Sequence, residues 1–385
     1  MKILRVISSV NPTGGGPIEG VLQSSKLLMN QGHLIELASL DNPNEEYLQQ
    51  IPIVTHALGP AKGTYAYNAN FQVWLNNHVK DYDVILVQGL WQFCGYATRK
   101  ACIKNNIPYF IFTHGMLDPW FKMTYPLKHL KKWLYWPWGE YRVLRDAKKV
   151  FFTTEEEKIL ARQSFWLYRC NEQVLSYGTA GSQGNKTEQQ QLFLQQQPHL
   201  KDKPFLLFLS RIHQKKGIDH LIKSFAAQQA LLGDTELVIA GPDQVGWQAE
   251  LEQLATTLGV ADKITWTGML SGDLKWGAYH CADAFILPSH QENFGIVVAE
   301  ALSCNVPVLI SNKVNIWREI QADQAGFVAD DTLEGCNTLI QQWQQQSESK
   351  KNNLRINARQ CFLKHFEINK AAESLISALT MEPRL

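Results

Sequence analysis

Short apolar runs alternate with longer amphipathic segments along almost the whole chain. Runs rich in Val, Ile, Leu and Phe are typical of strands buried on both faces of a parallel sheet. The segments between them have helical spacing, and one begins with the capping box Thr154-Glu-Glu-Glu157. This alternation predicts parallel sheets joined by crossover helices. The predicted strands are 3–10, 34–40, 53–58, 84–88, 109–113, 150–153 and 174–177, followed by 205–210, 236–240, 264–267, 284–287 and 306–310.

The alternation occurs twice, and a polar segment separates the two series. Residues 179–204 contain two Gln triplets, two prolines and little apolar periodicity, which is typical of a linker or mobile loop. A chain of 385 residues also exceeds one ordinary domain. We therefore expect doubly wound α/β domains over 1–180 and 204–355, a linker over 181–203, and a final helix over 356–379.

Composition narrows the class of protein. With 45% hydrophobic and 19% charged residues, the chain is predicted to be globular. Its first residues predict a strand rather than a signal peptide, and no apolar stretch reaches the ~18–20 residues of a membrane span. The seven cysteines form no C-x-x-C pair and the 11 histidines form no H-E-x-x-H motif. These patterns argue against a disulfide framework and a zinc site, and they favour a reducing cytoplasm.

The net charge of +1 conceals an uneven distribution. Residues 1–180 carry 19 Lys and Arg against 14 Asp and Glu, whereas the remainder carries 18 against 22. A mildly basic amino-terminal half suits an anionic acceptor or an anionic membrane face. It lacks the concentrated basic stripe that nucleic-acid binding requires, so no nucleic-acid partner is expected.

Two carboxylates, Glu292 and Glu300, stand eight residues apart in the segment PSHQENFGIVVAEAL. A predicted strand precedes Glu292 and a predicted helix contains Glu300, so the two lie roughly 12 Å apart along the helix axis. The carboxyl end of a strand beside a helix N-terminus is where an open parallel sheet binds its ligand. Spacing alone leaves a second interpretation open, in which the two are a capping acid and a solvated helix acid.

A basic turn, Ser210-Arg-Ile-His-Gln-Lys-Lys-Gly217, follows the first strand of the second half. Arg211 offers a bidentate fork and Lys216 a point charge, with Lys215 as a neighbour, while Gly217 permits close backbone approach. These features suit a diphosphate, although basic turns after strands are common. Further positions at strand ends are Asp243, Met269 and His290.

In the first half, a glycine run and a histidine occupy strand ends. Gly14, Gly15 and Gly16 follow the first strand and can direct amides towards an anion, or simply form a flexible turn. The dinucleotide fingerprint G-x-G-x-x-G is absent, which disfavours a dehydrogenase. His114 follows the fifth predicted strand and so lies at the ligand-binding edge, unless it only closes that strand end.

The segment 120–138 combines aromatic and basic residues. Leu127, Leu130 and Leu134 share one helical stripe beside a cluster of lysines. This composition suits the surface of an anionic membrane, or alternatively an amphipathic core helix with a solvated face. The aromatic residues are Trp120, Phe121, Tyr125, Trp133, Tyr135, Trp136 and Trp138, and the lysines are Lys122, Lys128, Lys131 and Lys132.

The segment around the two acids resembles the E-x7-E signature of retaining glycosyltransferases of family 4. The resemblance implies the GT-B fold, with two Rossmann-like domains facing a central cleft and a terminal helix, 356–385, packing back on the first domain. It implies that Glu292 contacts the donor sugar and Glu300 the ribose. Phe294 and Gly295 would present backbone amides near the diphosphate, and the strand-end loop at Met269 would contact the base.

The resemblance extends to three further sites. Arg211 and Lys216 match the R…KG turn that neutralises the leaving diphosphate, and Gly15 and Gly16 match the loop that lines the cleft. His114 matches an active-site histidine near the donor sugar and acceptor. No metal or other cofactor is implied, and the triplet Asp81-Tyr-Asp83 precedes a strand, at the wrong end of the sheet for metal-assisted catalysis.

The motif HGMLDPW with its following basic helix resembles bacterial exopolysaccharide glycosyltransferases. The implied activity is retaining transfer of a hexose from a sugar nucleotide to a glycan or polyprenyl-linked acceptor. The implied location is cytoplasmic, peripheral on the membrane through 120–138. Two alternatives stay open: a non-catalytic sugar-nucleotide-binding or scaffold protein, and a GT-B epimerase. A phosphorylase is disfavoured because no segment suggests a pyridoxal-phosphate lysine.

Overall fold

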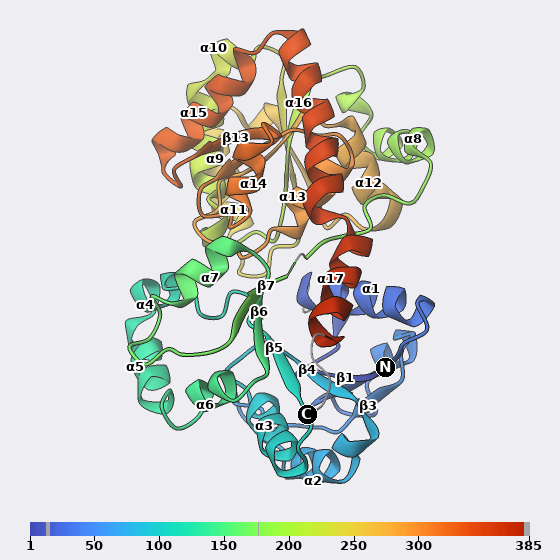
Figure 1. Cartoon of the computed structure of the whole chain (residues 1–385). Helices are drawn as coiled ribbons and strands as arrows, with labels where there is room; N and C mark the ends of the chain where they lie inside the picture. Colours follow the sequence, from blue (N-terminus) through green and yellow to red (C-terminus); the bar gives the residue numbers. More distant parts are fainter. Residues whose placement is uncertain (13–15, 176, 381–385) are drawn as a thin grey trace. The chain divides into compact units, whose positions relative to one another are not determined.

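The chain forms two compact units in a computed structural model that describes residues 1–12, 16–175 and 177–380, with residues 16 and 17 described by backbone only (Figure 1). Unit 1 comprises Met1–Tyr177 together with the chain from Ile368 onward, and unit 2 comprises Gly178–Glu367. The prediction of two parallel α/β sheets is confirmed. Each unit is described below by itself.

Unit 1 is built on a parallel sheet in the order β3-β2-β1-β4-β5-β6-β7. The register is continuous from β2 through β1 to β4, since Ile3 pairs with both Ile35 and Val84. The predicted strands are present, except that the first ends at Val6 rather than at residue 10 and the last covers Glu172–Val174 rather than 174–177. The strands are β1 (Lys2–Val6), β2 (Leu34–Ser39), β3 (Thr55–Ala57), β4 (Val84–Gln88), β5 (Tyr109–Phe112), β6 (Lys149–Phe152) and β7 (Glu172–Val174).

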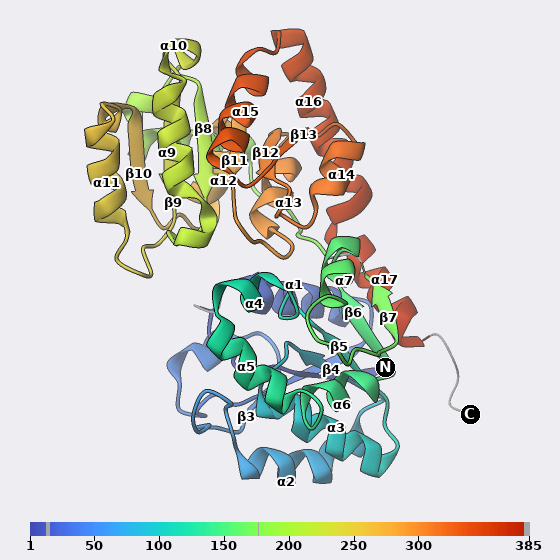
Figure 2. The same cartoon turned by 90° about the vertical axis from the view of Figure 1, so that its left-hand side faces the viewer.

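Each face of this sheet has its own hydrophobic core, because successive strand residues point to opposite faces. Leu4 contributes to the core under helices α2, α3 and α6, whereas Ile3 contributes to the core under α1 and α17. Figure 2 shows these two sets of helices on the two faces of the unit 1 sheet. The helices are α1 (Gly16–Asn30), α2 (Ala69–His78), α3 (Phe93–Asn105), α4 (Trp120–Thr124), α5 (Pro126–Tyr135), α6 (Glu140–Arg145), α7 (Glu155–Ala161) and α17 (Ile368–Thr380).

Unit 2 is built on a second parallel sheet in the order β10-β9-β8-β11-β12-β13. Its last strand was missed by the sequence analysis because Gly326–Ala329 is a short, half-buried edge strand without a long apolar run. The strands are β8 (Phe205–Leu209), β9 (Glu236–Ala240), β10 (Ile264–Gly268), β11 (Ala284–Leu287), β12 (Val308–Ser311) and β13 (Gly326–Ala329).

Two sets of helices pack within unit 2. In one set α9 contacts α11 and α15, and in the other α12 contacts α8 while α16 contacts α13 and α14. Figure 1 shows α9, α11 and α15 grouped together, apart from α8 and α12. The helices are α8 (Lys186–Gln196), α9 (Ile218–Ala227), α10 (Gln229–Leu232), α11 (Gln248–Thr257), α12 (Gly272–Cys281), α13 (Ile296–Ser303), α14 (Trp317–Ala322), α15 (Leu333–Gln344) and α16 (Glu348–Cys361).

The prediction of a linker over 181–203 is wrong, because this segment contains helix α8. Asn185 caps the helix by accepting hydrogen bonds from the amides of Thr187 and Glu188. The helix packs closely on α12, where a Cβ atom at Gly277 would lie 2.1 Å from the carbonyl oxygen of Gln189. The many glutamines of this segment give no apolar periodicity from which a helix could be predicted. The close contact of α8 with Gly277 of α12 exists only in the folded unit.

The predicted terminal helix over 356–379 is interrupted. α16 ends at Cys361, a π-helical turn covers Phe362–Phe366, and α17 begins at Ile368. α17 contacts α1 and places Ala372, Leu375 and Ala378 in a core of unit 1. Among the described helices, none has the length and apolar character needed to cross a membrane.

Candidate active site

The basic turn and the first acid of unit 2 follow two neighbouring strands. The chain builds β8, β9 and β10 outward on one side and then places β11 on the other side of β8. β8 and β11 therefore flank the point where the strand order reverses. Open parallel sheets bind ligands at the carboxyl ends of the strands at such a point. The residues from Arg211 to Gly217 follow β8, and Glu292 follows β11.

Three contacts join these two loops. Lys216 Nζ forms an ion pair with Glu292 Oε2, and the amide of His290 donates to the carbonyl of Lys215 at 2.8 Å. Gly217 has φ of +67°, and a Cβ atom there would lie 2.3 Å from the carbonyl oxygen of Pro288. Glycine is therefore required at this position by both conformation and space.

The ion pair of Lys216 and Glu292 is partly withdrawn from water, since the side chain of Glu292 is 22% exposed. Lys216 is 3% exposed. Burial by itself would raise the pKa of Glu292, but the positive charges of Lys216, Lys215 and Arg211 outweigh it and hold this pKa below its ordinary value. The carboxylate is thus ionised at neutral pH in contact with the buried ammonium group of Lys216.

The backbone around Glu292 is held on both sides. Its amide donates to the carbonyl of Lys313 at 2.9 Å, and its carbonyl accepts from the amide of Asn315 at 3.1 Å. Gly295, with φ of +72°, then begins α13. The turn between β11 and α13 therefore fixes where the Glu292 carboxylate can point.

Glu300 lies within α13 and is 3% exposed. Its Oε1 atom lies 2.7 Å from Lys275 Nζ, and its Oε2 atom accepts a hydrogen bond from the Tyr279 hydroxyl at 3.1 Å. The sequence analysis missed Lys275 and Tyr279. Their spacing of four residues puts them on one face of α12, but their pairing with α13 is a tertiary contact.

The other predicted residues of unit 2 lie in different environments. Arg211 is exposed, and its Nη1 atom donates to Gln244 Oε1 at 3.2 Å. Met269 follows β10 and is 72% exposed. The side chain of Phe294 is buried edge-on against Phe366, with ring centroids 5.6 Å apart.

Two weaker candidates have structural partners. Asp243 is exposed and accepts hydrogen bonds from the amides of Val245, Trp247 and Gln248, and these bonds lower its pKa. His290 Nδ1 lies 3.0 Å from Asp331 Oδ2, and this contact raises the pKa of the histidine.

His114 lies in unit 1, directly after β5, with φ of +48°. Its Nε2 atom is 2.9 Å from Gln88 Oε1, at the end of the neighbouring strand β4. Burial, with a smaller contribution from the charge of Arg5, lowers the pKa of His114 to about 4. The imidazole is therefore neutral at neutral pH. Gly16 begins α1, and Gly15 lies outside the described residues.

A buried carboxylate that the sequence analysis did not select holds the turn at His114. Glu157 Oε1 accepts from Thr113 Oγ1 at 2.5 Å and from the amide of Gly115 at 2.6 Å. Its Oε2 atom accepts from the amide and the hydroxyl of Thr153, both at 2.7 Å. In the sequence Glu157 appears only as the last residue of a capping box, so the contacts across to β5 gave no signal.

Two family models cover most of the chain and meet near the boundary of the two units. Residues 15–178 match a glycosyl transferase 4-like domain, and residues 189–361 match glycosyl transferases group 1. The first match falls in unit 1 and the second in unit 2. The chain is a family-4 glycosyltransferase.

Individual relatives agree with this assignment. An uncharacterised glycosyltransferase from Methanocaldococcus jannaschii is 34% identical over 128 residues, which cover 33% of this chain and 32% of the relative. An alpha-D-kanosaminyltransferase from Streptomyces kanamyceticus is 27% identical over 192 residues, covering 50% and 49%. The chain thus spans about a third to a half of the length of these curated relatives.

The fold of this family-4 glycosyltransferase is the GT-B fold. The Anabaena protein HepE, solved in complex with UDP and glucose, superposes with a TM-score of 0.78 over 99% of this chain and 100% of HepE, at 17% identity. Sucrose-phosphate synthase from Thermosynechococcus elongatus superposes with a TM-score of 0.74 over 98% of both chains, also at 17% identity.

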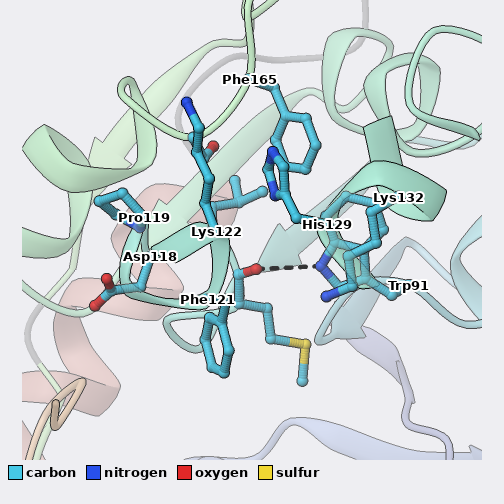
Figure 3. A pocket seen from close by; sticks show the side chains of 11 residues that line it. Trp91, Asp118, Pro119, Phe121, Lys122, His129, Lys132 and Phe165 are labelled. Carbon is cyan, nitrogen blue, oxygen red and sulfur yellow. Dashed lines mark hydrogen bonds between the residues drawn. The ribbon is translucent and has the colours of Figure 1, made fainter. Parts of the chain in front are cut away.

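Unit 1 of this family-4 glycosyltransferase also has a pocket of aromatic and basic side chains. Trp91, with φ of +70°, donates from Nε1 to the carbonyl of Met116 at 3.1 Å and lies under Lys132 Nζ, 4.4 Å from the ring centroid (Figure 3). Figure 3 shows Phe121, Lys122, His129 and Phe165 around the same space.

A second buried carboxylate supports that pocket. Glu140 is 0% exposed, its Oε1 atom accepts from the amide of Trp91 at 2.8 Å, and Oε2 has no hydrogen-bond partner among the described residues. Burial raises its pKa to about 7, against the opposing effects of the Trp91 amide and the charge of Lys132. Glu140 thus holds Trp91 in its unusual conformation at the cost of a poorly solvated carboxyl group.

The predicted helix of segment 120–138 is present as α4 and α5, but its leucine stripe is exposed. Leu127, Leu130 and Leu134 are 78%, 54% and 62% exposed. Within the same segment only Trp136 is fully buried among the described aromatic residues. The interpretation as a core helix with a solvated face is therefore wrong, because the apolar face itself points to solvent.

Proposed function

We propose that this glycosyltransferase transfers a hexose from a nucleoside diphosphate sugar to a glycan or polyprenyl-linked acceptor, with retention of anomeric configuration. The observation that carries the proposal is the ion pair of the buried Lys216 with Glu292 at the switch point of unit 2. A carboxylate and an ammonium group there offer partners for the two ends of a sugar diphosphate, the hydroxyls and the phosphates.

The donor site is proposed to use the residues around that pair. Lys216 and exposed Arg211 bind the diphosphate, and Glu292 accepts hydrogen bonds from the sugar once the phosphate has taken over Lys216. Glu300, oriented by Lys275 and Tyr279, accepts from the ribose hydroxyls. The amides of Phe294 and Gly295 lie at the start of α13, a suitable end of a helix for an anion. The loop at Met269 contacts the base.

In the proposed reaction the acceptor oxygen attacks the anomeric carbon from the face that the diphosphate leaves. The bond from carbon to phosphate oxygen breaks, and the leaving phosphate takes the acceptor proton. The enzyme positions both reactants and neutralises the charge that develops on the diphosphate, which is a large share of the work in such reactions. Arg211 and Lys216 do so from the donor side. His114, uncharged, orients hydroxyl groups by hydrogen bonding.

UDP is the first candidate for the nucleotide, because HepE was solved with UDP and glucose. The test is calorimetric binding of UDP, GDP and ADP without added metal, to the whole protein and to Arg211→Ala. We expect one nucleotide to bind, and Arg211→Ala to weaken it about tenfold or more, as loss of a charge-assisted contact should. Arg318→Ala, which removes an exposed arginine on α14, is the matched control.

The two alternative functions predict different results when the same protein preparation is assayed. A scaffold protein binds the nucleotide sugar but does not turn it over, and an epimerase changes the sugar without an acceptor. Retention is read from the anomeric proton coupling of the product by NMR. If none of the three nucleotides binds, the assignment of Arg211 and Lys216 to a diphosphate is wrong.

The acceptor side is proposed to contact an anionic membrane surface, as an enzyme of cell-surface polysaccharide synthesis would. The support is the exposed stripe of Leu127, Leu130 and Leu134 beside exposed Lys128 and Lys131. Co-sedimentation with vesicles containing phosphatidylglycerol tests it. We expect Leu130→Ser with Leu134→Ser to release the protein, and Ile356→Ser, an exposed residue of unit 2, to leave it bound. Equal release by both variants would contradict the contact.

A further inference from the structure

Three side chains that suit a metal ion converge at the end of unit 2. Asp323 follows α14, Cys361 is the last residue of α16, and His365 lies in the π-helical turn Phe362–Phe366. Their ligand atoms (one carboxylate oxygen, the thiol sulfur and one ring nitrogen) all lie within 4.8 Å of one another. None of these residues takes part in the proposed transfer reaction.

The local fold explains why the three converge. Cys361 and His365 are four residues apart, so a helical turn places them on one face. The turn between them is π-helical, a distortion that is frequent at functional sites. α14 contacts α16, which brings Asp323 to the same face, with Asp323 Oδ2 2.9 Å from His365 Nε2.

Burial of the three residues differs in a way that suits a bound ion. Cys361 is 0% exposed, whereas the side chains of Asp323 and His365 are 15% and 29% exposed. The sulfur therefore closes the inner side of the cluster, and the imidazole and carboxylate leave a route for an ion from solvent. Asp323 Oδ1 is 2.7 Å from Nζ of the exposed Lys364, whose positive charge competes with a bound cation for the carboxylate.

A further acidic residue lies one turn earlier on α14, outside the group of three whose ligand atoms lie within 4.8 Å of one another. Glu319 precedes Asp323 by four residues, and its Oε2 atom is buried without a hydrogen-bond partner among the described residues. Side chains four residues apart share one face of a helix. An unsatisfied buried carboxylate oxygen is unfavourable by itself and becomes favourable beside a cation.

We propose that Asp323, Cys361 and His365 form a binding site for a divalent cation of the zinc class, and that the Glu319 side chain turns towards the bound ion as the fourth ligand. The thiol, the imidazole and the Asp323 carboxylate already lie within 4.8 Å of one another, and together with a second carboxylate they match the donor atoms that Zn²⁺ accepts in tetrahedral sites. On binding, Cys361 releases its proton to solvent and forms the metal–sulfur bond. His365 binds as the neutral imidazole, and no electrons are transferred.

The consequence of binding is a cross-link between α14 and the turn that ends α16. His365 lies two residues before the end of unit 2 at Glu367. The cation therefore fixes the segment through which the chain leaves this unit. The role is structural or regulatory, and it stands independently of the proposed transfer reaction.

The test is titration of the metal-free whole protein with Zn²⁺ against a chromophoric chelator, and with Co²⁺ while the absorption spectrum is recorded. We expect one equivalent to bind, with a sulfur-to-cobalt charge-transfer band and the intense visible bands of tetrahedral Co²⁺. Loss of an inner ligand should cost more than the 10–100-fold typical of outer partners, so His365→Ala and Asp323→Asn should each weaken binding by about 100-fold. Cys170→Ser, which removes a half-buried thiol of unit 1, should change nothing.

A second variant distinguishes this site from binding to a lone thiol. Lys364→Gln removes the cation beside Asp323 and should tighten Zn²⁺ binding severalfold, because the repulsion between the two positive charges is lost. Lys364 is exposed, so this variant keeps its fold. Zn²⁺ binding that is unaffected by His365→Ala, or a Co²⁺ complex without the sulfur band, would overturn the proposal.

Discussion

Carboxylates that are buried or half-buried in the two units are stabilised in opposite ways. In unit 2, Glu292 and Glu300 each pair with a lysine, Lys216 and Lys275. In unit 1, the partners of Glu157 among the described residues are hydroxyls and backbone amides. The difference separates the proposed donor site of unit 2 from a structural carboxylate of unit 1. An ion pair exchanges partners readily when a charged ligand arrives, whereas a carboxylate saturated by backbone amides fixes the backbone that surrounds it.

Glu140 in unit 1 extends the comparison to pKa. Its pKa is raised to about 7 because burial is not offset by a paired cation, whereas cations hold the pKa of Glu292 below its ordinary value. The two carboxylates thus have opposite dependence on pH. Burial raises the pKa of Glu140, whereas neighbouring cations lower that of Glu292.

The largest effect should come from breaking the pair in unit 2. Glu292→Gln leaves Lys216 buried without its partner, which should cost roughly 3 kcal/mol of stability and lower sugar transfer about 100-fold to 1000-fold. The double variant Lys216→Met with Glu292→Gln should regain most of the stability and none of the activity. Melting temperature and donor turnover together measure this. A double variant that stays active would show that the pair is only structural.

A smaller effect should follow from changing the scaffold carboxylate of unit 1. Glu157→Gln replaces one carboxylate oxygen by an NH₂ group that faces hydrogen-bond donors. We therefore expect a loss of about 2–3 kcal/mol in the free energy of unfolding. A lower melting temperature and faster amide exchange at β5 and β6 measure this loss. Transfer should also fall, because the turn that carries His114 loosens. Glu155→Gln, on the exposed side of the same helix turn, is the control. Equal losses in both variants would refute the role of Glu157.

The smallest and most specific effect concerns pH. Folded unit 1 keeps the Glu140 proton up to about pH 7, whereas the unfolded chain releases it near the ordinary value of 4.5. The unfolded state therefore binds fewer protons in this window, and stability falls as pH rises from about 4.5 to 7. Glu140→Gln should remove this loss of stability, which amounts to about 3 kcal/mol at pH 8. Amide exchange of β4 and β5 at pH 5 and pH 8 measures this loss of stability. An equal loss between the two pH values with and without Glu140→Gln would contradict the assignment.

The same comparison shows where prediction from the sequence works. Buried parallel strands are recognisable as apolar runs. The strands around the switch point of unit 2 were therefore predicted correctly, and with them the loops that carry Arg211, Lys216 and Glu292. The leucine stripe of 127–134 predicted a helix from its period, yet period alone is the same for a core face and an exposed one. Helix α8 was missed because its sequence is rich in glutamine and its few apolar residues do not recur with the helical period.

Residue types and their order along the chain determined the two parallel sheets, the strand ends that carry charge, and the family. These features follow from local periodicity and from the rule that ligand groups gather at the carboxyl ends of parallel strands. Only the tertiary structure decided which charges are paired and which side chains meet across distant segments. Lys275 with Glu300, Glu157 with the His114 turn, and Asp323 with His365, 42 residues away, are contacts of this kind. Sequence spacing carries no information on such contacts, because packing between helices and strands sets them.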